Sequence, residues 1–273
     1  MPKSSPRFLI IRLSSIGDIV HALPVVAALG GTFPEAEIDW VVETRHADLL
    51  AGNPFIHRLI RLDTLGWRKR LISGSTIKSV ARGVAMLRQA EYDAAIDLQG
   101  LYKSALIARL SRSRERVGFA EPWLREPAAG VLYTQLVAPR GATHVIEMNM
   151  ALVERLGARS VAREGWQFPL PRTEGDDQYV EHQVAASGSD HFMVINPGGG
   201  WKNKCWAPEN YAELIRRLAG EIAGNIFLTG SSAEEPLIRE IIRTADSPRA
   251  KYIPSTITQF IALVRRAKLF VGG

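Results

Sequence analysis

The stretch that decides the fold is Phe8-Leu9-Ile10-Ile11-Arg12-Leu13-Ser14-Ser15-Ile16-Gly17-Asp18-Ile19-Val20. A short apolar run is followed by small and polar residues and then by a second apolar segment, which predicts a strand, a tight turn and a helix. We expect Gly17 to give the turn its backbone freedom and Asp18 to lie in the first helical turn, at the carboxyl end of the strand. Ligands bind at that edge in open α/β sheets. Acids in first turns also complement the helix dipole, so position alone leaves a capping role for Asp18 open.

Strands and helices alternate through the first half of the chain, which predicts right-handed βαβ units and a mostly parallel sheet. We expect strands at residues 37–42, 56–62 and 94–98, and helices at 46–52, 77–90, 101–110 and 144–156. Between residues 112 and 140 the pattern weakens, and no element is assigned there. The build is Rossmann-like. The sequence contains no G-x-G-x-x-G phosphate fingerprint, so a dinucleotide site of that type is not supported.

A Pro-rich segment at residues 168–175 predicts a linker, and we place a domain boundary between residues 172 and 173. A second α/β series follows, with strands expected at 192–195, 225–229, 251–253 and 268–271, and helices at 177–186, 209–219, 233–244 and 257–267. The predicted architecture is α/β, with an N-terminal domain of residues 1–172 and a C-terminal domain of residues 173–273. Because the chain stops directly after a strand, we expect the C-terminal domain to be truncated.

The composition is that of a globular protein, with 46% hydrophobic and 23% charged residues over 273 positions. No apolar stretch reaches the ~18 residues of a transmembrane helix, and no signal peptide is recognisable. The single cysteine, Cys205, fits a reducing cytoplasm. A formal net charge of +6 indicates an acidic partner. Since no nucleic-acid-binding motif accompanies the basic residues, a membrane surface or an anionic glycolipid is favoured over nucleic acid.

One strand-to-helix turn in the C-terminal half has the features of a phosphate site. The loop Asn196-Pro197-Gly198-Gly199-Gly200-Trp201 allows close approach of the backbone to a ligand. The helix that begins near Pro208 directs exposed N–H groups to the same place, where they favour an anion. Lys204 adds a mobile charge suited to phosphate. A Gly-rich surface turn with a solvated lysine has the same sequence, so the two interpretations stay open.

A second turn, at residues 229–235, contains Gly230 and two glutamates. A carboxylate there can accept hydrogen bonds from ribose hydroxyls, as acids do in other α/β nucleotide sites. Ser232 followed three residues later by Glu235 also matches a capping box, so we expect Glu235 to cap the helix and Glu234 to be the freer acid. A third turn of this kind, at residues 97–104, contains Lys103, which meets an anion or simply lies on the helix surface.

The sequence lacks the residue patterns of metal sites and of nucleophilic serine or cysteine sites. The six histidines show no metal-ligand spacing with Cys or acids, Cys205 has no histidine nearby in sequence, and no G-x-S-x-G elbow occurs. We therefore expect neither a metal site nor a nucleophilic serine or cysteine.

Several motifs in the correct order resemble the lipopolysaccharide heptosyltransferases of glycosyltransferase family 9, and most of all the heptosyltransferase I branch. The resemblance covers nearly the whole chain. It is carried by the opening stretch from Ile10 to Pro24, by Ile96-Asp97-Leu98-Gln99-Gly100-Leu101-Tyr102-Lys103-Ser104, by Trp67-Arg68-Lys69, by Arg125-Glu126-Pro127 and by the loop from Asn196 to Trp206.

This resemblance implies a GT-B fold, in which two Rossmann-like domains face a cleft, and a metal-independent, inverting transfer of L-glycero-D-manno-heptose. The donor would be ADP-heptose, with no separate cofactor, bound by the C-terminal domain. The acceptor would be a Kdo residue of lipid A, bound by the N-terminal domain. The protein would be cytoplasmic and peripheral at the inner face of the cytoplasmic membrane.

Matched residue by residue, the resemblance makes Asp18 the general base. On the donor side, Lys204 corresponds to the diphosphate-binding lysine and Glu234 to the ribose-binding acid, and the donor loops also contain Gly199, Gly200 and Gly230. The positions that match basic residues on the acceptor side are Arg68, Lys69, Lys103 and Arg125.

Two other functions stay open at this stage. One is a catalytically idle, GT-B-like binding protein, which a lack of ADP affinity and of turnover would favour. The other is a glycosyltransferase that uses a different sugar nucleotide, which competition between nucleotide sugars would reveal.

Overall fold

The computed structural model describes residues 5–69, 73–199, 205–221 and 223–272, except for the side chains of residues 68 and 69. The chain divides into two compact units, Met1–Leu170 and Pro171–Gly273, which are described separately below. Within the described ranges, no helix has the length and apolar character of a membrane-spanning segment.

The first unit is built on a parallel sheet. Its strands are β1 (Arg7–Ile11), β2 (Glu37–Glu43), β3 (Arg58–Leu62), β4 (Ala94–Asp97), β5 (Glu115–Phe119) and β6 (Gln135–Val137). They lie in the order β3-β2-β1-β4-β5-β6, and every neighbouring pair is parallel. This is the strand order of the doubly wound Rossmann fold, whose direction of winding reverses between β1 and β4. A ligand crevice is expected outside the carboxyl ends of those two strands.

Strands β5 and β6 lie in the segment where no element was expected. β6 has three residues and lies at the edge of the sheet, and β5 begins with Glu115 and Arg116. Such short, polar, partly exposed strands carry too few alternating apolar residues to be recognised. The two strands form because neighbouring strands supply their hydrogen-bond partners.

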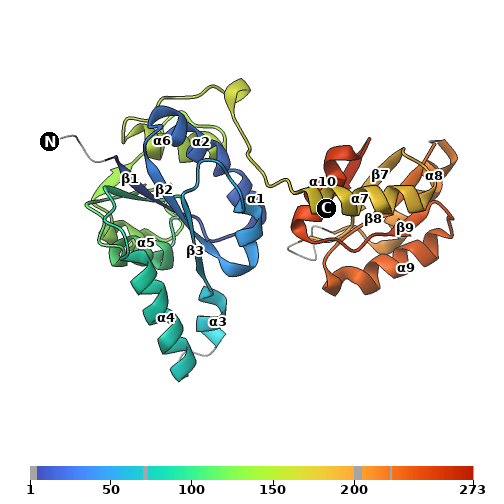
Figure 1. The fold of residues 1–273 in the computed structure, drawn as a ribbon, viewed down its shortest axis with the longest axis horizontal. Coiled ribbons are helices and arrows are strands. Elements are labelled where there is room, and N and C mark those ends of the chain that lie inside the picture. Colours follow the sequence, from blue (N-terminus) through green and yellow to red (C-terminus); the bar gives the residue numbers. More distant parts are fainter. Residues whose placement is uncertain (1–4, 70–72, 200–204, 222, 273) are drawn as a thin grey trace. The chain divides into compact units, whose positions relative to one another are not determined.

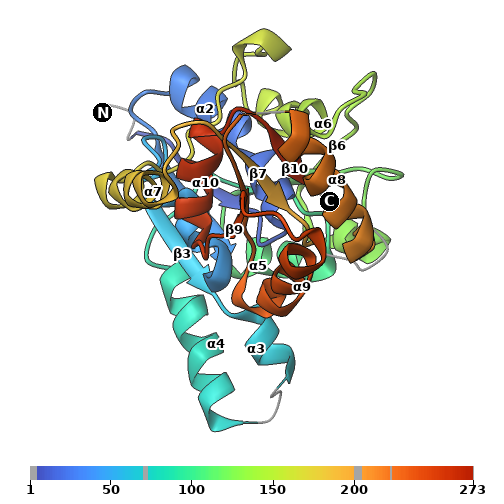
Figure 2. The same cartoon turned by 90° about the vertical axis from the view of Figure 1, so that its right-hand side faces the viewer.

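Helices cover both faces of this sheet. α2 (Leu23–Thr32) and α6 (Val145–Glu154) pack together on one face, and α5 (Tyr102–Leu110) lies on the other (Figure 1). α4 (Gly74–Leu87) and the unexpected α3 (Thr64–Lys69) lie side by side and extend away from the sheet (Figures 1 and 2). The helix expected at 46–52 is a 3₁₀ helix, η1 (Thr44–Leu50). The short elements that remain are α1 (Ile16–Val20), η2 (Pro127–Leu132) and η3 (Arg163–Gly165).

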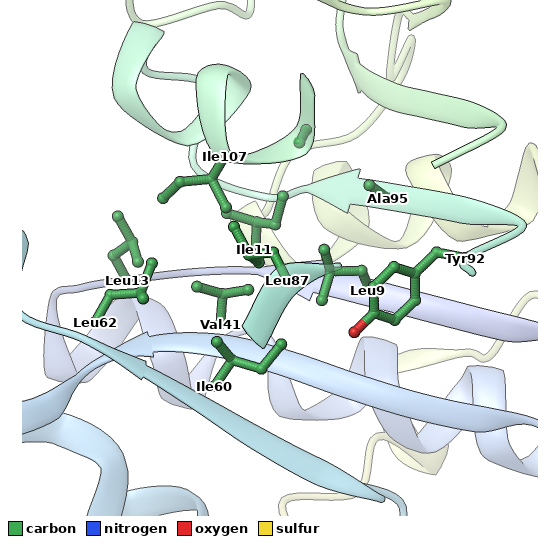
Figure 3. Packing of buried hydrophobic residues seen from close by; sticks show 11 residues of the cluster. Leu9, Ile11, Leu13, Val41, Ile60, Leu62, Leu87, Tyr92, Ala95 and Ile107 are labelled. Carbon is green, nitrogen blue, oxygen red and sulfur yellow. The ribbon is translucent and has the colours of Figure 1, made fainter. Parts of the chain in front are cut away.

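One core cluster lies between the strands and α4 and α5. Figure 3 shows Leu9, Ile11 and Val41 from the strand region packed with Leu87 of α4 and Ile107 of α5. Successive strand side chains point to opposite faces, so Leu9 and Ile11 enter the same cluster. This packing fixes β1, and with it the turn that follows β1.

The second unit repeats the parallel pattern with fewer strands. Its strands are β7 (Phe192–Asn196), β8 (Asn225–Leu228), β9 (Ala250–Tyr252) and β10 (Phe270–Gly272), in the order β10-β7-β8-β9. All neighbouring pairs are parallel. α8 (Pro208–Glu221) and α9 (Glu235–Ala245) pack on one face, and α7 (Glu174–Ser187) and α10 (Ile257–Arg266) on the other (Figure 2). The 3₁₀ helix η5 (Ser232–Glu234) leads into α9.

Candidate active site

The turns after β1 and β4 meet at the point where the sheet reverses. The Leu98 amide donates to the Ile11 carbonyl at 3.1 Å, and the Leu13 amide donates to Gln99 Oε1 at 2.9 Å. The Gln99 side chain is buried. These hydrogen bonds hold the two turns together across the place where α/β folds bind their ligands.

Asp18 lies at this switch point, in the first turn of α1. Its Oδ2 accepts from the Ser15 amide and the Ser15 hydroxyl, both at 3.2 Å, and Ser15 is the N-cap of the helix. Both expected properties, a first-turn position and a capping contact, are therefore present. The role expected for Gly17 is wrong, because Gly17 lies within α1 and is not among the residues of positive φ. The turn is made instead by Leu13, Ser14 and Ser15.

Two arginines face the other carboxylate oxygen. Arg12 Nη2 lies 2.6 Å from Asp18 Oδ1, and Arg125 Nη2 lies 3.7 Å from the same atom. Burial raises the pKa of Asp18, but attraction to Arg12, the Ser15 N–H and attraction to Arg125 outweigh it, so the pKa lies below the ordinary aspartate value. The Asp18 side chain is 23% exposed, so solvent or a substrate can reach it. Asp18 is thus an ionised, partly accessible carboxylate.

Arg12 is almost completely buried, with 2% of its surface exposed. Its Nη1 donates to the Leu98 carbonyl directly after β4. Although Nη2 is close enough to Asp18 for an ion pair, neither Nη2 nor Nε has a partner with hydrogen-bond geometry among the described residues. Arg12 was not among the predicted site residues. In the sequence, Arg12 is visible only as a single charged residue directly after an apolar strand, six residues before Asp18. Its contacts in the structure show that it belongs to the site.

A buried polar network supports the turn after β4. Asp97 Oδ1 accepts from the amides of Gln99 and Gly100, at 2.8 and 3.2 Å, and the Tyr133 hydroxyl donates to Oδ2 at 2.6 Å. Burial raises the pKa of Asp97 in spite of the hydrogen bonds from Tyr133 and Ser104, which lower it. No ion pair to Asp97 occurs in the described part of the unit. The carboxyl group is therefore held by hydrogen bonds.

Of the residues predicted on the acceptor side, the structure places Arg125 beside Asp18. Its loop is attached to the turn after β4, since the Glu126 amide donates to the Gly100 carbonyl at 3.2 Å and Glu126 Oε2 accepts from the Tyr102 amide at 2.6 Å. Lys103 is exposed on α5, and no ion pair joins it to another described residue. Arg68 and Lys69 have side chains outside the described part of the chain.

In the second unit, Glu234 lies over the loops that follow β7 and β8. Its Oε2 accepts from the Ser231 amide and hydroxyl, at 2.7 and 2.6 Å. A Cβ atom at Gly198 would lie 1.6 Å from Glu234 Oε1, and one at Gly230 would lie 3.1 Å from Oε2. Glycine at both positions therefore lets the carboxylate approach the backbone of the two loops.

The expected division of roles between the two glutamates was wrong. Glu234, and not Glu235, completes the capping box, with Ser231 in place of Ser232 as its partner. Glu235 instead forms an ion pair with Arg239 at 2.7 Å. The capping motif occurs one residue earlier because a 3₁₀ turn precedes α9. Gly199 is an exposed residue of the β7 loop, whereas Gly200 and Lys204 lie outside the described residues.

Comparison with known proteins identifies a family and several relatives. The family model of glycosyltransferase family 9 (heptosyltransferase) matches residues 80–273. Lipopolysaccharide heptosyltransferase 1 of Pseudomonas aeruginosa is 29% identical over 230 residues, which cover 84% of this chain and 62% of that protein. The Escherichia coli K12 protein of the same name is 32% identical over 217 residues, which cover 78% and 65%. The chain thus spans less than two thirds of the length of these relatives.

Among solved structures, Escherichia coli heptosyltransferase WaaC with ADP-2-deoxy-2-fluoro heptose is similar with a TM-score of 0.78 and 26% identity. The match covers 97% of this chain and 82% of that one. The two Rossmann-like units described above have the GT-B fold of these enzymes. With the family model matched over most of its length, the chain belongs to glycosyltransferase family 9, the heptosyltransferases.

Proposed function

We propose that this protein transfers L-glycero-D-manno-heptose from ADP-heptose to a Kdo residue of lipid A, in the inner-core stage of lipopolysaccharide biosynthesis. The observation that carries the proposal is the ionised, partly accessible Asp18 carboxylate at the β1–β4 switch point. The relatives' names support heptose transfer, and the similar WaaC structure holds ADP-2-deoxy-2-fluoro heptose, an analogue of ADP-heptose.

In the proposed reaction, Asp18 acts as the general base. The acceptor hydroxyl oxygen attacks the anomeric carbon of the heptose, the bond from that carbon to the ADP oxygen breaks on the opposite face, and the configuration inverts. The hydroxyl proton passes to Asp18. A carboxylate with a lowered pKa is a weak base, but the hydroxyl becomes strongly acidic as its oxygen bonds to the electron-poor carbon. Late proton transfer to Asp18 is therefore sufficient.

On the donor side, we propose that Glu234 accepts hydrogen bonds from the ribose hydroxyls. One of its oxygens caps the turn before α9, and this fixes the direction of the carboxylate. Lys204 and the N-terminus of α8, near Pro208, are proposed to stabilise the charge that develops on the departing diphosphate, with Gly199, Gly200 and Gly230 allowing close approach of the backbone. This scheme uses no metal and no cofactor apart from the donor itself.

On the acceptor side, we propose that Arg125 binds an acidic group of the acceptor beside Asp18. Its side chain is 54% exposed, and its guanidinium, with Nη2 3.7 Å from Asp18 Oδ1, can turn toward a ligand. Arg68, Lys69 and Lys103 are proposed to bind further acidic groups.

Residues 64–90 contain six Lys or Arg residues and no acid. Each such charge near an anionic leaflet contributes about 1 kcal/mol, which supports peripheral binding to the inner face of the cytoplasmic membrane.

The experiment that tests the proposal is the Asp18→Asn variant, assayed with ADP-heptose and Kdo-lipid A, with ADP binding measured by calorimetry. Loss of the base should lower turnover by ~10²- to 10⁴-fold and leave ADP affinity unchanged. Parallel reactions with other nucleotide sugars identify the donor.

Asp176→Asn is the matched control. Asp176 is also a first-turn acid, and its Oδ2 accepts from the N-cap hydroxyl of Thr173 at 2.6 Å, but it begins α7 and not α1. If Asp18 only caps its helix, the two variants should have similar turnover, and that result would exclude Asp18 as the base. Absence of both ADP binding and transfer in the unmodified protein would instead refute the proposed activity.

A further inference from the structure

Arg12 connects three separate parts of the switch point. Its own backbone extends β1, since its amide donates to the Val41 carbonyl at 3.2 Å and its carbonyl accepts from Trp40 Nε1 at 3.0 Å. Its guanidinium reaches the Leu98 carbonyl after β4 on one side and the Asp18 carboxylate of α1, at 2.6 Å, on the other. A single buried side chain therefore links the catalytic candidate to the two central strands.

The surroundings of Arg12 leave its guanidinium little freedom. The side chain is 2% exposed, and the backbone on which it lies is tied to the turn after β4 through Leu13 and Gln99. Burial of a guanidinium is costly, and Nε has no hydrogen-bond partner among the described residues. Nη2 offsets part of this cost through its ion pair with Asp18 Oδ1 at 2.6 Å. Burial of a hydrophobic residue at this position would cost less free energy. The presence of an arginine therefore indicates a role other than packing.

We propose that Arg12 is a positioning residue, whose guanidinium holds the Asp18 carboxylate in one orientation toward the acceptor hydroxyl. The inference rests on the proposed role of Asp18 as general base. Ser15 holds Oδ2 from the helix N-cap, at 3.2 Å, and Arg12 holds Oδ1 from the strand side. With two points of attachment, the plane of the carboxylate is fixed. With Ser15 alone, a carboxylate on the five-residue helix α1 rotates about its side-chain bonds.

The charges around Asp18 give this arrangement a measurable signature. The charged or titratable groups that act on this carboxylate or on Arg12 are Arg12, Arg125, His21 and Asp97. Burial lowers the pKa of His21, with His144 acting in the same direction, so His21 adds little charge near neutral pH. Burial also raises the pKa of Asp18, and Arg12 is the strongest influence that opposes it. Without Arg12, Asp18 should keep its proton to higher pH.

The test compares Arg12→Gln and Arg12→Lys with Arg58→Gln. Arg58 is a matched control, because it pairs with the buried Asp39 at 2.6 Å but lies at the start of β3, away from the switch point. Two readouts are used, the carboxyl-carbon NMR titration of Asp18 in this chain and the pH dependence of kcat. The NMR titration needs no transferase activity, so the inference can be judged even if the proposed function fails.

Arg12→Gln should move the Asp18 titration and the acid limb of kcat to higher pH and lower kcat by about 10²-fold, the cost of a misplaced catalytic group. Arg12→Lys keeps the charge but loses the fork that reaches both Leu98 and Asp18. It should leave the acid limb near that of the unmodified protein and still lower kcat about tenfold. Arg58→Gln should leave the titration and kcat unchanged within a factor of about two.

An unchanged Asp18 titration in Arg12→Gln, together with kcat within a factor of about two, would overturn the proposal. So would a full return of activity in Arg12→Lys, because a charge alone would then suffice. If the variants do not fold, the inference can still be tested by NMR on the unmodified protein. The Arg12 guanidinium protons should exchange slowly with water and show cross-peaks to Asp18, and rapid exchange without cross-peaks would refute the attachment.

Discussion

Replacement of Tyr133 by Phe tests the buried network beneath the switch point. The Tyr133 hydroxyl donates to Asp97 Oδ2 at 2.6 Å, and both residues are buried. The substitution removes one oxygen atom and leaves the ring in place, so no large cavity forms. The effect therefore comes from the lost hydrogen bond.

The size of the stability loss depends on whether Asp97 is ionised. A hydrogen bond to a charged group contributes ~1.5–3 kcal/mol, and one between neutral groups ~0.5–1.5 kcal/mol. Tyr133→Phe should therefore lower the free energy of unfolding by about 2–3 kcal/mol where Asp97 is ionised. For a unit of this size each kcal/mol lowers Tm by roughly 2–4 °C, so Tm should fall by roughly 4–12 °C.

The effect should also depend on pH, with a definite sign. Burial raises the pKa of folded Asp97, and the Tyr133 hydrogen bond lowers it again in part. A raised folded pKa costs stability as pH rises from the unfolded aspartate value, about 3.9, through the folded value. Tyr133→Phe raises the folded pKa further and widens that window. The destabilisation should be small near pH 4 and larger at pH 8.

Urea unfolding is measured at both pH values, with hydrogen exchange in β1 and β4 to report the first unit alone. Tyr92→Phe is the matched control, because the Tyr92 hydroxyl also donates to a buried aspartate at 2.6 Å. That residue, Asp39, keeps two further contacts, from Arg58 Nε at 3.0 Å and Arg58 Nη2 at 2.6 Å. Tyr92→Phe should therefore cost less than Tyr133→Phe at pH 8, about 1 kcal/mol. Equal, pH-independent losses in the two variants would refute the reasoning.

Three further predictions concern backbone packing and helix capping. In Gly118→Ala the new Cβ would lie 2.4 Å from the Tyr133 ring, so overpacking should cost ~1–3 kcal/mol in urea unfolding; a neutral effect would show that the ring can move. In Gly224→Ala, a φ of +107° and a backbone carbonyl oxygen 2.1 Å from the new Cβ should together cost at least ~2 kcal/mol and lower the Tm of the second unit. The Thr143 N–H is the main group that lowers the pKa of Glu147 to about 2, so the stability from Glu147 is present above its ordinary pKa and lost as pH falls toward 2. Melting curves of Glu147→Gln and the unmodified protein should converge there, and a constant gap would contradict this cause.

The central strands were predictable from sequence because they are buried on both faces. The expected strand at 94–98 is observed as β4, and the expected Phe8–Ile11 strand as β1. The strand β5 and the edge strand β6 were not predictable. Their polar residues are tolerated because each strand is partly exposed and takes its hydrogen bonds from a neighbour.

The candidate site shows the same division. The order of neighbouring residues is enough to predict that Asp18 lies in the first turn of a helix. It does not show that Ser14 and Ser15, and not Gly17, form the turn before that helix. The capping partner of α9 was misassigned by one residue, since Ser231 with Glu234 and Ser232 with Glu235 have equal spacing. Local sequence rules cannot separate two overlapping motifs.

By itself, the sequence determined the α/β alternation, the strand, turn and helix around Asp18, and the family resemblance. These are properties of neighbouring residues, which local backbone preferences and apolar periodicity control. Only the tertiary structure decided that Arg12 and Arg125, which are 113 positions apart, face the same carboxylate oxygen, and that the turn after β4 lies beside both. The physical reason is the strand order. Parallel pairing of β1 with β4 brings distant loops to one edge of the sheet, where burial and charge together set the state of Asp18.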